Sequence, residues 1–188
     1  MSNYSKKQTK LFYLLVVLIV AESLFIFSSF TEVGSKFKSN LASILPSVLV
    51  METNKERLAQ DLSELTENEL LKDAAQLKAN EMAEKGFFSH VGPDGKQPWA
   101  YLDEVGYKYA AAGENLAVNF VHSKEVHKAW MNSPTHKANI IQPKFTEIGI
   151  ATAKGIYKGQ EVVFVVQFFA KPKNDVFYSV FYKIGSKI

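Results

Sequence analysis

The sequence predicts an α+β fold, because helical patterns occupy its first part and strand patterns its last part. Apolar residues recur at helical spacing in the stretch that ends near Lys85, and helix-start patterns continue as far as Ser133-Pro134. Two apolar, β-branched runs then follow, at residues 147–153 and 162–169. Helices and strands that are segregated along a chain are typical of the α+β class.

Composition limits the kinds of protein that this chain can be. Its 188 residues suit one domain plus a targeting segment. Hydrophobic residues make up 47% and charged residues 22%, which argues against disorder and against a multi-span membrane protein. The chain has no cysteine, which excludes disulfides, thiolate metal sites and a cysteine nucleophile. Its net charge of +3 is spread along the sequence, so we expect no nucleic-acid partner.

The N-terminal part of the chain predicts membrane targeting. Residues 1–10 precede an apolar run at residues 11–30, which is long enough to span a hydrocarbon core of about 30 Å. The lysines that favour a cytoplasmic N-terminus are Lys6, Lys7 and Lys10. Glu22 interrupts the run, at a cost that the surrounding apolar residues offset. We expect a single-pass membrane anchor with the domain outside the cytoplasm, and secretion after cleavage of a signal peptide is the alternative.

The folded domain is predicted to cover residues 45–171. Residues 31–44 before it form a short tether, because Gly, Ser, Lys and Asn interrupt their apolar pattern. Residues 172–188 after it are too short to span a membrane, and their pattern is compatible with a strand or with an interfacial segment.

Two capping boxes indicate the first helices of the domain. Residues 53–56 have the Thr-x-x-Glu form and predict a helix over this stretch. Residues 66–69 repeat the form and open a longer helix to about Lys85, which Gly86 ends. The residues of this helix at helical spacing are Leu70, Ala74, Leu77, Lys78 and Met82.

Shorter elements fill the rest of the domain. They are a Pro-Asp-Gly turn at 93–95, helices at 98–105, 123–130 and 133–141, strands at 147–153 and 162–169, and a hairpin loop at 155–159. The aromatic, Ala-rich stretch between Gly106 and Gly113 is assigned no element. Trp130 and Phe168 lie on apolar faces of predicted elements, so we expect both to be buried.

The four histidines divide into two pairs. His122 and His127 are predicted on the solvated, polar side of the helix at 123–130. His90 and His136 lie at the edges of elements, where binding sites often occur, and each has either a structural role or a role in a site. The predicted helix start at His136 favours the neutral imidazole, which is the form that binds a metal.

Two glutamates also have two interpretations. Glu114 lies among small and apolar residues and needs a polar partner, such as a histidine or a backbone N–H, so it is either structural or part of a site. For Glu147, which precedes a strand, we favour the structural role. Gly-x-Ser-x-Gly, phosphate loops and His-Glu-x-x-His are absent from the sequence.

Several short motifs follow one another in the order found in a known family. They are Thr53–Arg57, Ala79–Ala83, Phe87–His90, Gly106-Tyr107, Gly113–Ala117, Trp130–Ile140, Phe145–Ile150 and Val165–Phe168. With these motifs the chain resembles the CAP superfamily of cysteine-rich secretory, antigen 5 and pathogenesis-related proteins. It is most similar to the bacterial, cysteine-free members.

The resemblance implies a three-layer α-β-α sandwich, with helices on both faces of a small antiparallel sheet and a cleft that holds histidines and acids. His90, Glu114 and His136 match three of the four cleft residues of eukaryotic members. The fourth is the acid of a Trp-x-x-Glu motif, and Ser133 stands in its place here. The resemblance therefore implies that these four residues line one cleft.

Two functions are compatible with such a cleft. We favour a binding module for an extracellular peptide, lipid or cell-wall component, with Zn²⁺ or another divalent ion on His90 and His136. Glu114 would orient a histidine or a metal-bound water. The alternative is a hydrolase of extracellular peptide or cell-wall substrates, with Glu114 as the general base for a metal-bound water. Two histidine ligands make a thin catalytic site, since catalytic zinc usually has three protein ligands.

Overall fold

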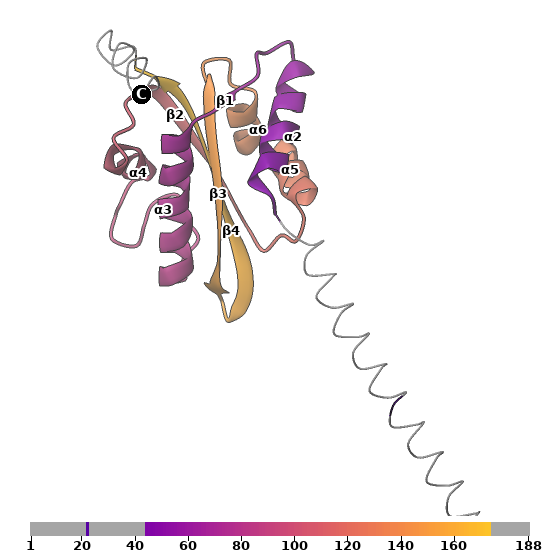
Figure 1. Cartoon of the computed structure of the whole chain (residues 1–188). Helices are drawn as coiled ribbons and strands as arrows, with labels where there is room; N and C mark the ends of the chain where they lie inside the picture. The colour runs from indigo at the N-terminus through magenta and orange to yellow at the C-terminus, as the bar shows by residue number, and fades with distance from the viewer. Residues whose placement is uncertain (1–21, 23–43, 174–188) are drawn as a thin grey trace, which may run out of the picture. The chain divides into compact units, whose positions relative to one another are not determined.

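The computed structural model describes Glu22 and residues 44–173, and it confirms the α+β prediction (Figure 1). The elements are α2 (Pro46–Leu58), β1 (Thr66–Glu67), α3 (Glu69–Lys85), α4 (Pro98–Glu104), β2 (Tyr109–Val118), α5 (Ser123–Asn132), α6 (Pro134–Ile140), β3 (Glu147–Tyr157) and β4 (Gln160–Pro172). Apart from Glu22, the predicted anchor at 11–30 lies outside the described residues, as do most of the tether and of the C-terminal extension. Within the part of the chain that the structure describes, no helix is both long and apolar enough to cross a membrane.

The four strands form one sheet in the order β1-β3-β4-β2. β3 and β4 form an antiparallel hairpin, β2 pairs antiparallel with β4, and β1 adds a parallel pairing to the start of β3. Helices α3 and α4 cover one face and α2, α5 and α6 cover the other, which confirms the predicted α-β-α sandwich (Figure 1). One edge of the sheet is therefore β2, and the opposite edge is β3 beyond its short pairing with β1.

β4 is a central strand with apolar side chains on both of its faces, which is why its sequence is a nearly continuous apolar run. The core on the α3 side holds Phe164, Val166 and Phe168, and the core on the α2 side holds Val165 and Phe169. Trp130 is 2% exposed and Phe168 is 0% exposed. Both predictions of burial are therefore confirmed.

The start of α3 differs from the prediction. The helix is capped by Asn68, whose Oδ1 accepts a hydrogen bond from the backbone N–H of Leu71 at 3.2 Å. A cap at Thr66 is wrong, because Thr66 and Glu67 form β1 and pair with the start of β3. Gly86 ends the helix as predicted, in the left-handed conformation with a φ of 64°.

The buried face of α3 is also shifted relative to the prediction. Leu70 and Leu77 are 37% and 42% exposed, and the helix packs on the sheet through smaller residues such as Ala75 and Ala79. The reason is a close approach of the two backbones. A Cβ added at Gly149 of β3 would lie 2.2 Å from the carbonyl carbon of Leu71, so this position requires glycine. Ala74, Lys78 and Met82 are fully buried as predicted, so the prediction is wrong for the two leucines.

The helix predicted at residues 53–56 is confirmed, but it is longer than its capping box suggests. α2 begins at Pro46, with proline in the first turn and Leu45 at the N-cap position. Thr53 is buried within the helix, and its Oγ1 accepts a hydrogen bond from Gln167 Nε2 of β4 at 3.0 Å. The threonine thus links helix and sheet instead of capping.

No strand was predicted where β2 forms, and the hairpin loop is shorter than the predicted range of 155–159. β2 is rich in alanine, which has low strand propensity, and it forms because β4 pairs along it. The β3–β4 hairpin turns at Lys158 and Gly159, with φ values of 51° and 78°, as expected of a two-residue loop. Gly155 lies inside β3, not in the loop.

Candidate functional site

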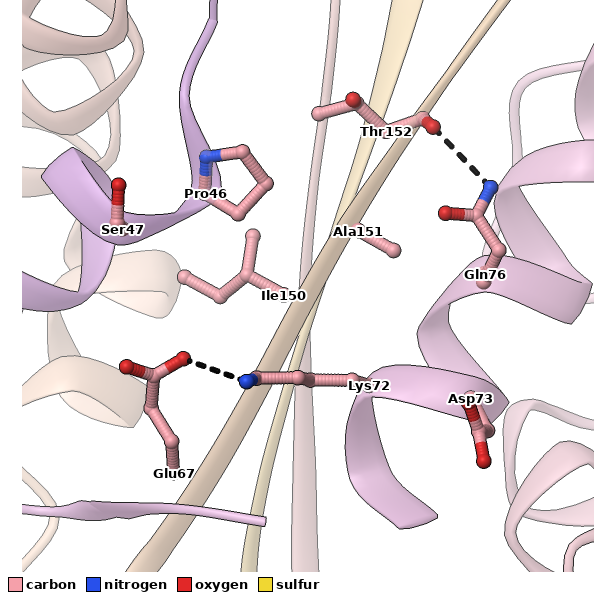
Figure 2. Close-up of a pocket in the computed structure, with 9 residues that line it drawn as sticks. All are labelled: Pro46, Ser47, Glu67, Lys72, Asp73, Gln76, Ile150, Ala151 and Thr152. Carbon is pink, nitrogen blue, oxygen red and sulfur yellow. Dashed lines mark hydrogen bonds and ion pairs between the residues drawn. The ribbon is translucent and has the colours of Figure 1, made fainter. Parts of the chain in front are cut away.

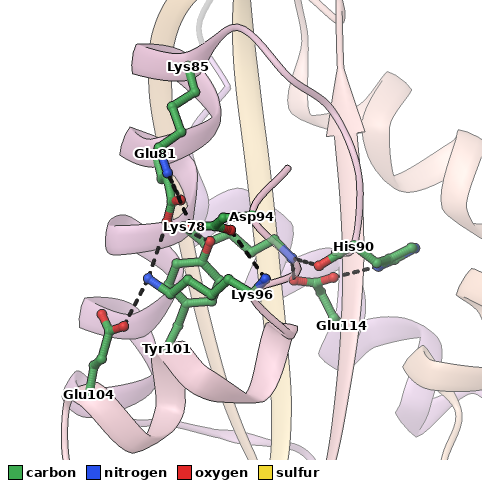
Figure 3. Close-up of polar contacts among 9 residues, drawn as sticks. All are labelled: Lys78, Glu81, Lys85, His90, Asp94, Lys96, Tyr101, Glu104 and Glu114. Carbon is green, nitrogen blue, oxygen red and sulfur yellow. Dashed lines mark hydrogen bonds and ion pairs between the residues drawn. The ribbon is translucent and has the colours of Figure 1, made fainter. Parts of the chain in front are cut away.

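Glu114 is the centre of the polar cluster at the β2 edge of the sheet. Its side chain is only 2% exposed. One carboxylate oxygen, Oε1, lies 2.5 Å from His90 Nδ1, and the other, Oε2, lies 2.6 Å from the ammonium of Lys78 (Figure 3). Oε2 has no partner with hydrogen-bond geometry among the described residues, so the contact with Lys78 acts as an ion pair. A buried carboxylate requires such compensation.

Lys78 is the residue of this cluster that the sequence analysis did not assign to a site. It projects from α3, its side chain is 0% exposed, and its ammonium also donates to the backbone carbonyl of His90. The ammonium lies 5.5 Å from the centre of the Tyr101 ring. Burial lowers the pKa of Lys78, and the charge of Glu114 opposes that effect. The position of Lys78 in the apolar stripe of α3 could have indicated this role, because a buried lysine requires a carboxylate nearby.

His90 lies in the loop between α3 and α4, and a second charged cluster ties that loop to α3. Glu81 of α3 accepts hydrogen bonds from Tyr101 at 2.7 Å and from Lys96 of the loop at 3.2 Å (Figure 3). Burial raises the pKa of Glu81, but the hydrogen bonds from Lys85, Tyr101 and Lys96 outweigh it and bring the value to about 2. The loop is therefore tied to α3 at His90 through Lys78 and after it through Lys96, and the side chain of His90 is 56% exposed.

His136 is half-buried in the first turn of α6. Its Nδ1 lies 2.8 Å from the hydroxyl of Ser133, the residue at the N-cap position. Burial lowers the pKa of His136, and the neighbouring His90 lowers it further. The two imidazoles are thus close enough for their charges to interact.

Amide side chains dock α6 onto β2 and hold the backbone of His136 against Asn115, the residue after Glu114. Asn115 Nδ2 donates to the backbone carbonyl of His136 at 3.2 Å and to Gln167 Oε1 at 3.0 Å. Asn139 Nδ2 donates to the backbone carbonyl of Glu114 at 3.0 Å and to Asn115 Oδ1 at 2.9 Å. No role was predicted for these amides. Asn115 and Gln167 lie within apolar strands, and polar residues in such positions indicate a buried hydrogen-bond network.

The remaining histidines and Glu147 are structural or exposed. His122 is exposed, as predicted. His127 was predicted on a solvated face, and this is wrong: α2 packs against α5, so His127 is 9% exposed and burial lowers its pKa. Glu147 Oε2 accepts hydrogen bonds from Asn68 at 2.9 Å and Tyr107 at 2.6 Å, in agreement with a structural role.

The donor atoms of the cluster fit a metal ion only in part. His90 and His136 each use Nδ1 for a neighbouring oxygen, which leaves each Nε2 as the ring nitrogen suited to ligation. Glu114 is engaged by His90 and by Lys78, so it is not a free third ligand. Within the described residues, no group of three or more His, Asp or Glu side chains is arranged to hold a metal. The described residues therefore lack the three-ligand set of catalytic zinc.

The fold and its motifs match a known family. The model of the cysteine-rich secretory protein family, CAP, matches residues 50–168. The chain belongs to the CAP family. This match covers every residue of the polar cluster, from Lys78 to His136, and confirms the resemblance that the motifs indicated.

Two relatives of this CAP protein come from Bacillus subtilis. The protein YkwD is 41% identical over 98 residues, which cover 52% of this chain and 38% of YkwD. The membrane protein YlbC is 27% identical over 105 residues, which cover 56% of this chain and 30% of YlbC. The matching part of the CAP protein therefore spans well under half the length of these relatives.

Solved structures share the fold. An extracellular Bacillus anthracis protein with an SCP domain is 25% identical, with a TM-score of 0.58 over 66% of this chain and 39% of that one. An outer surface protein of Borrelia burgdorferi is also 25% identical, with a TM-score of 0.58 over 68% of this chain and 92% of that one.

Proposed function

We propose that this CAP protein is a binding module displayed outside the cytoplasm, and that His90, His136 and Ser133 contact its ligand. The observation that carries the proposal is the state of Glu114. Its carboxylate is buried between His90 and the Lys78 ammonium, so it orients an imidazole and is poorly placed to activate water. His90, which Glu114 orients, is exposed and available to a ligand.

The location rests on the N-terminal sequence and on the relatives. Residues 11–30 have the length and hydropathy of a membrane anchor, with lysines before them. The structural relatives are an extracellular protein and an outer surface protein. Both observations support a domain that faces the outside of the cell.

The ligand classes that suit this position are a peptide, a lipid or a cell-wall component. Imidazole nitrogens and a serine hydroxyl offer hydrogen-bond donors and acceptors to any of these. Purified full-length protein should be tested for binding to peptidoglycan, phospholipid vesicles and a mixture of unstructured peptides, with turnover monitored in the same samples. We expect binding that the double substitution His90→Ala/His136→Ala abolishes, without turnover. Turnover that disappears in Glu114→Gln would instead support a hydrolase and refute the binding module.

A divalent ion between the imidazoles is the second part of the proposal. Because Nδ1 of each ring is engaged, Nε2 of His90 and of His136 can ligate Zn²⁺, with water in the other positions. Both rings must be neutral, so the affinity should fall in acid. Because burial lowers the pKa of His136, that ring stays neutral to below about 6.5, the ordinary histidine value.

Calorimetric titration of the full chain with Zn²⁺ at pH 7.5 and pH 5.5 tests this part. We expect His136→Ala to weaken binding by at least about tenfold, or roughly 1.4 kcal/mol. The matched control is His122→Ala, an exposed histidine to which none of the cluster's hydrogen bonds or ion pairs is assigned, and it should change nothing. Equal affinity of the wild type and of His90→Ala/His136→Ala would show that the imidazoles hold no metal.

The orientation across the membrane is tested separately. Protease added to intact cells should digest residues 45–171, because the lysine-flanked run at 11–30 is expected to keep residues 1–10 inside. A domain that is cut only after lysis would contradict the proposed location.

A further inference from the structure

The β3 edge of the sheet carries unused backbone hydrogen-bonding groups. β1 pairs with β3 only at Glu147 and Ile148, after which the chain turns into α3. Alternate residues of a strand direct their N–H and C=O to opposite sides. The carbonyl of Ile148 points outward, because it accepts from the backbone N–H of Asn68. The outward residues beyond it are Ile150, Thr152, Lys154 and Ile156.

Within the described residues, no strand pairs with this part of the edge. The contact made there is from a side chain: Gln76 Nε2 donates to the carbonyl of Thr152 at 3.1 Å. The short parallel pairing with β1 shows that the same edge accepts a strand at its beginning. An open edge of this kind is a template for strand addition.

A groove of about 410 Å³ runs along the open edge, between α2 on one side and α3 on the other (Figure 2). Pro46 and Ser47 form its α2 wall, and Asp73 and Gln76 belong to its α3 wall. Ile150 to Thr152 of β3 form its floor. A strand that pairs with β3 would place alternate side chains against the two walls.

The end of this groove nearest β1 and the start of α3 carries a net negative charge. Lys72 Nζ lies 3.1 Å from Glu67 and 2.9 Å from Glu69, and Asp73 follows it on the groove wall. The charged residues that line the groove are the carboxylates Glu67 and Asp73 and the ammonium Lys72, which leaves one negative charge on this rim. Glu67, Glu69 and Lys72 are 42%, 78% and 33% exposed, so a partner can reach these charges.

We propose that the β3 edge binds an extended, basic peptide segment of another protein by strand addition. The peptide pairs with the outward groups from Ile150 to Ile156, a length of about 20 Å at about 3.3 Å per residue. Its lysine or arginine side chains face Asp73 on the α3 wall, and its opposite side chains face Pro46 and Ser47. Main-chain pairing supplies affinity, and the acidic rim supplies selectivity. This site is independent of the proposed function of the His90–Glu114 cluster, which lies at the other edge.

The test uses the full chain and three synthetic nine-residue peptides. The first alternates valine and threonine and carries two lysines on one face. The second carries glutamates in place of the lysines, and the third has a central proline that removes an N–H donor. Affinity is measured by fluorescence polarisation, and amide hydrogen exchange is measured by NMR. We expect the lysine peptide to bind at least tenfold more tightly than either of the others. It should slow exchange at the outward amides of Ile150, Thr152, Lys154 and Ile156.

Two variants locate the site. Asp73→Lys should weaken binding of the lysine peptide at least tenfold and strengthen binding of the glutamate peptide. The matched control is Glu84→Lys, an exposed residue of the same helix that does not line the groove, and it should have little effect. Thr152→Pro should abolish binding, since proline is tolerated on an edge strand but blocks pairing there. Circular dichroism confirms that each variant is folded.

Three results would overturn the proposal. The first is equal affinity for the three peptides. The second is unchanged exchange at the four outward amides when the lysine peptide is bound. The third is slowed exchange that depends on protein concentration without peptide, which would assign the edge to a second copy of this chain.

Discussion

At the β2 edge of the sheet, helices α5 and α6 supply side chains to the outward carbonyls, whereas residues 44–173 give the β3 edge far less cover. Trp130 Nε1 donates to the carbonyl of Leu116 at 2.9 Å, and Asn139 Nδ2 donates to that of Glu114 at 3.0 Å. Along β3, Gln76 donates to the carbonyl of Thr152. The closed edge therefore uses buried side chains both to protect the strand and to build the polar cluster, and the open edge keeps its backbone available.

The two edges also differ in how they treat charge, and one helix contributes to both. Lys78 of α3 faces the β2 edge, where its side chain and that of Glu114 are 0% and 2% exposed. Lys72 of the same helix faces the β3 edge, where its pairs with Glu67 and Glu69 are solvated. The pairs have similar N–O distances, so burial is the variable that separates them.

The largest expected difference in stability is between variants of the side chains that cover the two edges. Trp130→Ala should lower the free energy of unfolding by about 3–5 kcal/mol, because it removes a fully packed aromatic ring and the donor to Leu116. Gln76→Ala, which removes the half-buried donor to Thr152, should cost less than about 1 kcal/mol. Urea unfolding measures both. Similar losses for the two variants would mean that the edges are equally protected.

The two lysines of α3 give a matched comparison of charge. Lys78→Met should cost about 3–5 kcal/mol, because it leaves the Glu114 carboxylate buried without its ammonium. Lys72→Met should cost about 0–1 kcal/mol, since its pairs are exposed. Replacing both partners, in Lys78→Met/Glu114→Leu, should recover much of the lost stability. If Lys78→Met were as mild as Lys72→Met in urea unfolding, Glu114 would not depend on the ammonium.

A smaller effect concerns the acid that anchors the His90 loop. The pKa of Glu81 is lowered from 4.5 to about 2 in the folded protein, so its contribution to stability is present above about pH 4.5 and is lost as the pH falls toward 2. Glu81→Gln should cost about 1–3 kcal/mol at pH 7, and this difference should shrink in acid. Thermal unfolding from pH 7 to pH 2 measures it. Glu84→Gln, an exposed residue of the same helix, is the control, and an equal pH response of the two variants would contradict the assignment.

The histidines show which features local sequence context predicts and which it does not. Sequence context indicated that His90 and His136 lie at the edges of elements, and the structure places His136 in the first turn of α6 but His90 within the loop between α3 and α4. The same reasoning put His127 on a solvated face, but α2, which precedes it by many residues, covers that face. Exposure on a helix depends on which other element packs against it, and local periodicity contains no information on that choice.

The sequence by itself determined the α+β class, the helix that Gly86 ends, the two apolar strands, the burial of Trp130 and the family. Each of these depends on local periodicity, on turn residues or on an ordered set of motifs. The tertiary structure alone decided that Lys78 neutralises Glu114 and that Asn115 and Asn139 dock α6 onto β2. It also decided that, within residues 44–173, no strand pairs with β3 beyond Ile148 on its outer side. These features join residues from different elements, and their energies depend on burial and on strand order.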